Sequence, residues 1–108
     1  MTQLSRDPAP AFQASMPESY QRQFDAAQAA AHAHLSGSRA HSGVRVGTFP
    51  SQRQGTALCV VADDRPGLLA TISAALVLQE LDVIEAEAYT RRELGRPDEA
   101  VDVFWVRH

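Results

Sequence analysis

Residues 60–72 read VVADDRPGLLATI, an apolar run that stops at two aspartates, turns through Arg65-Pro66-Gly67 and continues as an amphipathic segment. The pattern predicts a strand, a tight turn and a helix. The first N–H groups of a helix lack intrahelical acceptors, so such a turn can hold a small anionic or zwitterionic ligand. We expect Asp63 or Asp64 to cap the helix and Pro66 to preset its first turn. Gly67 would let a ligand approach closely. Taken alone, the pattern equally fits a turn that binds nothing.

The composition is that of one ordinary globular domain. The chain has 108 residues, of which 44% are hydrophobic and 21% charged, and its net charge of −3 argues against nucleic-acid binding. All cationic residues are arginine, so a P-loop lysine and a Schiff base are excluded. No run approaches the ~20 apolar residues of a membrane span, and the N-terminus lacks an apolar signal segment. We expect a cytoplasmic protein with no membrane partner, in which Cys59 is a buried thiol.

The N-terminal third of the chain predicts an arm followed by helix. Residues 1–14 contain two prolines and no periodicity, which predicts a flexible arm. Residues 15–36 predict a helical linker that begins with a capping box at Ser15 and Glu18. Asp25 and Gln28 form a second box, so the helix can divide there into two. We expect Gly37 to end it.

The remaining residues predict four strands and one helix. Strands are expected over 43–49, 56–62, 83–90 and 100–106, and a helix over about 66–80. The strand at 56–62 is apolar on both faces, as a central strand is. Glu85 and Glu87 point to one side of their strand, which predicts a sheet with one solvated face. This explains the two glutamates better than a catalytic carboxylate pair does.

Two strings in this region resemble the signature of ACT domains, which are regulatory modules that sense amino acids and other small metabolites. They are Asp64-Arg65-Pro66-Gly67-Leu68-Leu69 after the apolar strand and Leu81-Asp82-Val83-Ile84 after the helix. The resemblance implies a ferredoxin-like α/β (α+β) two-layer sandwich of four antiparallel strands with two helices on one face. It implies no cofactor, and it implies a small-molecule site formed by Asp64, Arg65, Pro66, Gly67, Leu68 and Leu69 of one copy with Asp82, Val83 and Ile84 of another. The protein would then work as a homodimer or as a paired ACT domain.

The order of elements departs from the usual ACT domain, which runs β-α-β-β-α-β. Residues 56–106 supply only β-α-β-β, whereas a helix and the strand at 43–49 precede them. A short hairpin through residues 50–55 would pair strand 43–49 antiparallel with strand 56–62. We therefore predict a circularly permuted ACT domain over residues 43–108, with its core motif at 56–106. The alternative is a fragment of a longer protein whose following residues complete the domain.

The resemblance is closer to one set of ACT domains, the repeats of the bifunctional uridylyltransferase/uridylyl-removing enzymes that modify the PII protein. It spans residues 57–69 and 99–104, and Met16-Pro17-Glu18-Ser19-Tyr20 resembles the linker before their first repeat. It implies the sensory part of such an enzyme, which responds to amino acids such as glutamine in nitrogen regulation. The metal-binding aspartates and the His-Asp pair of those enzymes are absent, so no catalytic residue is expected. Where this chain has Asp82, amino-acid-binding ACT domains often have Asn, whose amide meets both ends of the ligand. A carboxylate there favours the alternative of a ligand-free dimerisation module.

Two further patterns are weaker candidates for function. His32 and His34 lie two residues apart on the predicted helix and point in different directions, so we expect no shared metal ion. Phe104 and Trp105 could suggest an RNA-binding sheet. Because adjacent strand residues face opposite ways and no basic aromatic motif accompanies them, we expect no nucleic-acid partner.

Overall fold

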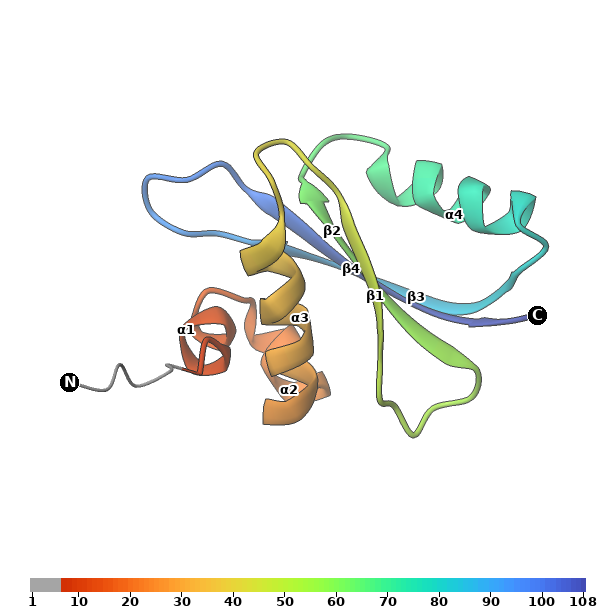
Figure 1. The fold of residues 1–108 in the computed structure, drawn as a ribbon, viewed down its shortest axis with the longest axis horizontal. Coiled ribbons are helices and arrows are strands. Elements are labelled where there is room, and N and C mark those ends of the chain that lie inside the picture. Colours follow the sequence, from red (N-terminus) through yellow and green to blue (C-terminus); the bar gives the residue numbers. More distant parts are fainter. Residues whose placement is uncertain (1–6) are drawn as a thin grey trace.

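The computed structural model describes residues 7–108 and holds a four-stranded antiparallel sheet (Figure 1). The strands are β1 (Arg45–Phe49), β2 (Thr56–Asp63), β3 (Asp82–Arg91) and β4 (Glu99–Arg107). The helices are α1 (Ala9–Ala14), α2 (Glu18–Gln23), α3 (Ala26–Ser38) and α4 (Leu68–Leu78). This is an α+β sandwich compatible with a ferredoxin-like ACT fold, as predicted.

The strand order, β1-β2-β4-β3, confirms the predicted hairpin. β1 runs antiparallel to β2, with Val46 opposite Val60. β4 lies between β2 and β3 and is antiparallel to both. The helix α4 therefore joins two parallel strands across β4. This order matches a ferredoxin-like sheet in which β1 takes the place of the last strand. The predicted permutation of the strands, with β1 paired beside β2, is therefore present in the sheet.

The prediction that two helices share one face is wrong. The helix α3 and the N-terminal helices pack on the sheet face that carries Cys59, Val103 and Trp105. The helix α4 packs on the opposite face, against Val60 and Phe104, and Figure 1 shows the sheet between the two helical layers. The reason lies in the central strands. β2 and β4 are apolar on both faces, so each face needs a cover.

The N-terminal segment is part of this cover. Residues 9–14, which were expected to be a flexible arm, form α1, and Ala9 and Phe12 are buried. The part of that expected arm over residues 1–6 lies outside the described residues. Ser15 does not cap α2, because its hydroxyl donates to the Phe12 carbonyl at the end of α1. The second predicted capping box is present at Asp25 and Gln28, where the helix divides. Gly37 does not end α3, which continues to Ser38.

Aromatic side chains fill the layer between these helices and the sheet. Tyr20, Phe24, His32 and Trp105 pack together there, and the Phe24 and Trp105 rings are stacked with centroids 6.4 Å apart. The Tyr20 hydroxyl lies 2.6 Å from His32 Nδ1. Burial lowers the pKa of His32 to about 4, so the imidazole is neutral near pH 7. His34 is exposed. The predicted burial of Cys59 is confirmed.

The expected solvated face of β3 is partly covered. Glu85 and Glu87 both accept from the Arg53 guanidinium, at 2.8 and 3.0 Å, and Arg53 lies 3.9 Å over the Trp105 ring. A register shift between Val83 and Glu85 turns the Ile84 side chain toward the same aromatic layer. The glutamates therefore take part in an ion-pair network at the edge of this layer.

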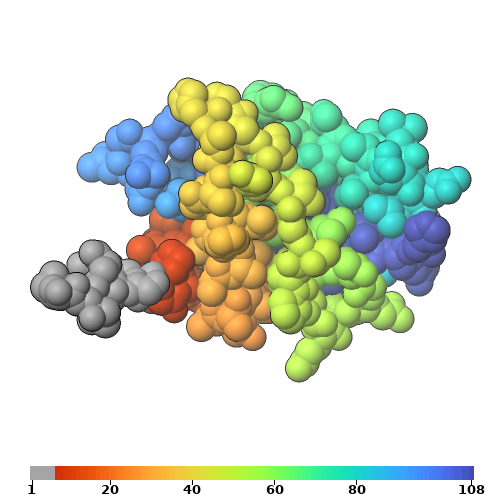
Figure 2. All heavy atoms as spheres, viewed as in Figure 1, coloured from red at the N-terminus to blue at the C-terminus, as the bar shows by residue number. Residues whose placement is uncertain are grey.

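Val46 of β1 and the preceding Val44 point away from the aromatic layer. Val46 and the preceding Val44 are each 58% exposed, whereas Gly47 lies under Leu35 of α3 and Phe49 is buried. Figure 2 shows α3 and β1 side by side, as their packing requires. Because α3 covers the other face, Val44 and Val46 have no helix above them.

Candidate ligand-binding site

The turn between β2 and α4 has a different local structure from the one expected. The helix begins at Leu68 with Gly67 as its N-cap, and no side chain caps it. Gly67 has a φ of 77°, which explains the glycine, and an added Cβ there would meet nothing within 4 Å. The open space beside Gly67 leaves room for a bound molecule. The helix is also shorter than predicted and ends at Leu78.

The two aspartates that were expected to cap the helix have other partners. Asp63 Oδ1 accepts from Arg39 Nη1 at 2.9 Å. Asp64 Oδ2 accepts from the Thr90 hydroxyl at 3.2 Å, and the Asp64 N–H donates to the Asp98 carbonyl. These bonds join the end of β2 to the residue that follows α3, to β3 and to the loop between β3 and β4. The Asp64 carboxylate is thereby held beside β3.

A cavity of about 400 Å³ lies between this turn and the sheet. Its lining includes five of the predicted site residues, namely Asp64, Arg65, Gly67, Leu68 and Leu69. Pro66 does not line it. The other side of the cavity is formed by β3 and β4, with Ala88, Thr90 and Asp102.

The remaining predicted site residues lie elsewhere in the same chain. Asp82, Val83 and Ile84 begin β3, and Thr90, which contacts the turn, is eight residues further along the strand. Eight strand residues span roughly 26 Å. One chain therefore does not bring residues 82–84 to the cavity at residues 64–69. They could meet only through a second copy.

Asp102 is the lining residue that sequence reasoning missed. It is 3% exposed and lies in the middle of the sheet, paired with Val60 on β2 and Ala88 on β3. Burial and, second to it, the nearby Asp64 charge raise the pKa of Asp102 to about 6. The sequence carried a signal for it, since the strand pattern puts this aspartate on one face with Phe104 and Val106.

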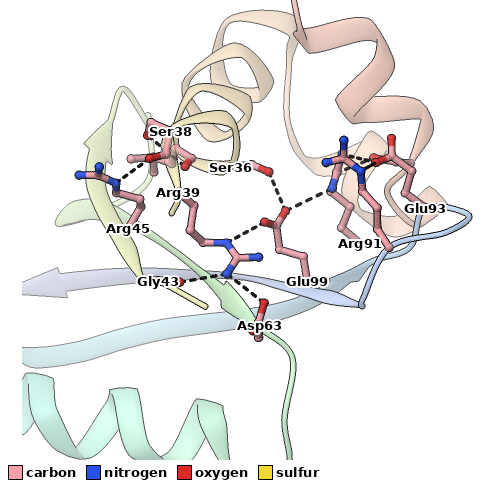
Figure 3. A network of polar contacts seen from close by, with 12 residues as sticks. Ser36, Ser38, Arg39, Gly43, Arg45, Asp63, Arg91, Glu93 and Glu99 are labelled. Carbon is pink, nitrogen blue, oxygen red and sulfur yellow. Dashed lines mark hydrogen bonds and ion pairs between the residues drawn. The ribbon is translucent and has the colours of Figure 1, made fainter. Parts of the chain in front are cut away.

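A second buried carboxylate, Glu99, lies on the opposite face of the sheet (Figure 3). It accepts from the Ser36 hydroxyl at 2.7 Å and from Arg39 Nε at 2.9 Å, and Arg91 Nη1 lies 3.4 Å away. Arg39 also bonds Asp63 and the Gly43 carbonyl, so this network joins α3 to three strand ends. The Glu99 carboxylate has its hydrogen-bond donors and counter-charges within the chain, which indicates a structural role.

The strand order is compatible with the sheet of a ferredoxin-like ACT fold. Over 61 residues the chain is 36% identical to the ACT domain-containing protein ACR3 of Arabidopsis thaliana. The aligned segment covers 50% of this chain and 14% of that relative. The chain thus spans about one seventh of the relative's length. The similarity supports an ACT domain here, and with it a regulatory rather than a catalytic module. No protein-family model and no solved structure matches the chain.

Among residues 7–108, no helix has the length and apolar character that crossing a bilayer requires. Within the same residues, no group of three or more His, Cys, Asp or Glu side chains could hold a metal ion.

Proposed function

We propose that this chain is a regulatory module that senses a small amino-acid-type molecule in the cavity beside the β2–α4 turn. The observation that carries the proposal is the position of that cavity, which coincides with the string through which the chain resembles ACT domains. The partial similarity to a plant ACT domain-containing protein supports the same reading. The module has no catalytic residues of its own. By its resemblance it would be the cytoplasmic sensory part of a PII uridylyltransferase-like system in nitrogen regulation, with glutamine as the first effector to test.

The proposed working unit is a homodimer or a paired ACT domain. Residues 82–84 of a second copy would then reach the cavity that they cannot reach within one chain. Exposed apolar side chains support pairing, because Val77 is 62% and Leu78 is 81% exposed on α4, and Val44 and Val46 are exposed beside β1. Ligand bound between two copies would favour one relative arrangement of them, and this shift in population would be the signal.

The test is a thermal-shift panel of amino acids, glutamine first, combined with light scattering for the mass. A ligand present at 100 times its dissociation constant adds about 2.7 kcal/mol to the free energy of unfolding. An upward shift of the melting temperature with one amino acid, in a particle of twice the chain mass, is the expected result. Catalytic uridylyl transfer by the purified chain would contradict the proposal.

A second candidate function is a dimerisation module that binds no metabolite. The observation that favours it is Asp82, whose side chain is exposed and whose charge would repel a ligand carboxylate. A stable dimer that responds to no amino acid or nucleotide would favour this candidate. A regulatory fragment of a larger nucleotidyltransferase is the third, and the sequence of the natural gene on either side of these residues decides it.

A further inference from the structure

The Asp102 carboxylate has no cationic partner among the residues that the structure describes. Ten ion pairs join side chains among residues 7–108, and none of them includes Asp102. Its neighbours across the sheet, Val60 and Ala88, are apolar, and α4 above it carries no charged residue from Leu68 to Leu78. The backbone N–H of Tyr89 favours the charged form of Asp102, but it supplies no counter-charge. A buried carboxylate without a counter-charge destabilises a fold, so Asp102 is a candidate partner for a cation from outside the chain.

The charge is directed to a cavity large enough for a small molecule. Asp102 lines the cavity of about 400 Å³ at the β2–α4 turn, together with the apolar side chains of Leu68 and Leu69. The other charged residues of the lining are Asp64 and Arg65, and both are exposed. The deep end of the cavity is therefore negative, while the only cation of its lining stands at the exposed turn.

This arrangement is complementary to a molecule with a positive end and a negative end. An ammonium group bound at Asp102 would supply the missing partner, and the methylene groups next to it would contact Leu68 and Leu69. The carboxylate of the same molecule would remain near Arg65 and the first N–H groups of α4. A lone anion would meet two carboxylates in this cavity and is disfavoured.

We propose that Asp102 binds the ammonium group of a free α-amino acid in this cavity, with Arg65 at the carboxylate end. This inference rests on the proposed sensing function, since it names the chemical class of the ligand and the residue that recognises it. It places recognition of the amine within one copy of the chain. An amino acid whose nitrogen is acylated carries no positive charge and should be rejected.

The first experiment compares each amino acid that stabilises the protein with its N-acetyl derivative, by isothermal titration calorimetry at pH 7.5. We expect acetylation, and separately Asp102→Asn, to weaken binding about 10- to 100-fold, because each removes one charge of a buried charge-assisted hydrogen bond. The matched control is Asp98→Asn, which removes an exposed carboxylate paired with Arg92 outside the cavity. It should bind as the unaltered protein does. Equal affinity for the free and acetylated forms, or unchanged binding by Asp102→Asn, would overturn the assignment while leaving the sensing function in place.

A second measurement tests the ammonium site independently of amino-acid sensing. Ethylammonium chloride is titrated against the ¹⁵N-labelled protein, with sodium chloride at the same ionic strength as the reference. Saturable shifts of the amide signals of Asp102, Ala88 and Leu69, absent in Asp102→Asn, would support the ammonium site even if no amino acid binds. In that outcome the sensing function fails and the site stands. No shift specific to ethylammonium, together with no discrimination between free and acetylated amino acids, would refute the site.

Discussion

The two faces of the sheet each bury one carboxylate of β4, and they treat it in opposite ways. On the face covered by α3, Glu99 is 5% exposed and bonds Ser36, Arg39 and Arg91. On the face covered by α4, Asp102 is as deeply buried, and no arginine between residues 7 and 108 pairs with it. The first carboxylate joins helices to strands. The second, Asp102, is available to bind a cationic group of a ligand.

The Glu99 face is also the more densely packed of the two. Three helices and an aromatic layer cover the Glu99 face, whereas a single short helix covers the Asp102 face, with exposed apolar side chains at its end. We therefore expect the densely packed face to contribute most of the stability, and local changes to occur at the thinly covered face.

The largest expected effect contrasts the two helical covers. Phe24→Ala should lower the free energy of unfolding by about 3–5 kcal/mol, because Phe24 is buried and stacked on Trp105. Leu78→Ala, at the exposed end of α4, should change it by less than about 0.5 kcal/mol. Urea unfolding followed by the fluorescence of Trp105, the only tryptophan of the chain, measures both. Equal losses would mean that the two faces share the stability evenly.

The second prediction concerns the two carboxylates at pH 7.5. Glu99→Gln should destabilise the protein by about 1.5–3 kcal/mol, because it removes the buried charge that accepts from Ser36, Arg39 and Arg91. Arg39 then keeps Asp63, and Arg91 keeps Glu93, as the remaining carboxylate. Asp102→Asn should do the reverse and stabilise by about 1–3 kcal/mol, because burial raises the pKa of Asp102 to about 6 and the neutral amide avoids the buried charge. The same urea experiment applies. A loss of stability in both variants would contradict the difference between the faces.

The sequence predicted the parts of this comparison that depend on local pattern. The turn at residues 63–68, the capping box at Asp25 and the β1–β2 hairpin follow from spacing and turn residues, and the structure contains them. The face on which α3 packs could not be predicted in this way, because it depends on contacts between Phe24, Trp105 and α1 that lie far apart in sequence. The ferredoxin-like resemblance then put both helices on one face of the sheet, whereas α3 and α4 lie on opposite faces.

For the candidate site, the sequence identified the turn and missed the deep end of the cavity. Residues 64–69 were found because a strand, an Arg-Pro-Gly turn and a helix are visible in order. Asp102 is 38 residues beyond Asp64, and only strand pairing brings it beneath α4. The alternation in β4 did show an aspartate sharing a face with Phe104 and Val106. A polar residue on an apolar face is the signal that could have found it.

The third prediction uses pH to separate the faces. His32, whose pKa is lowered, keeps its full contribution to stability above about pH 6.5 and loses it as the pH falls toward 4. Asp102, whose pKa is raised to about 6, takes up a proton in the folded state and so adds stability as the pH falls below 6. Between pH 6.5 and 4.5 the two terms are each about 2 kcal/mol and nearly cancel.

Without the Asp102 carboxylate, the pH-dependent contribution of His32 to the free energy of unfolding should become visible. We expect Asp102→Asn to lose about 2 kcal/mol more than the unaltered protein between pH 6.5 and 4.5. Unfolding in urea at several pH values, again followed through Trp105, gives both curves. Asp98→Asn is the control and should parallel the unaltered protein. Parallel curves for Asp102→Asn would show that Asp102 is ionised alike in the folded and unfolded chain.

The smallest expected effect on stability concerns Asp82, at the far end of the α4 face. Its carboxylate lies 3.9 Å from Arg107 Nε and both side chains are exposed, so Asp82→Asn should change the free energy of unfolding by less than about 0.5 kcal/mol. Its effect on ligand binding is the informative one. If residues 82–84 of a second copy reach the turn, removing the negative charge should strengthen binding of an amino-acid carboxylate severalfold in the dimer. Calorimetry of Asp82→Asn, with Glu80→Gln as an exposed control nearby, measures this. Unchanged affinity would mean that one copy binds the ligand alone, between Arg65 and Asp102.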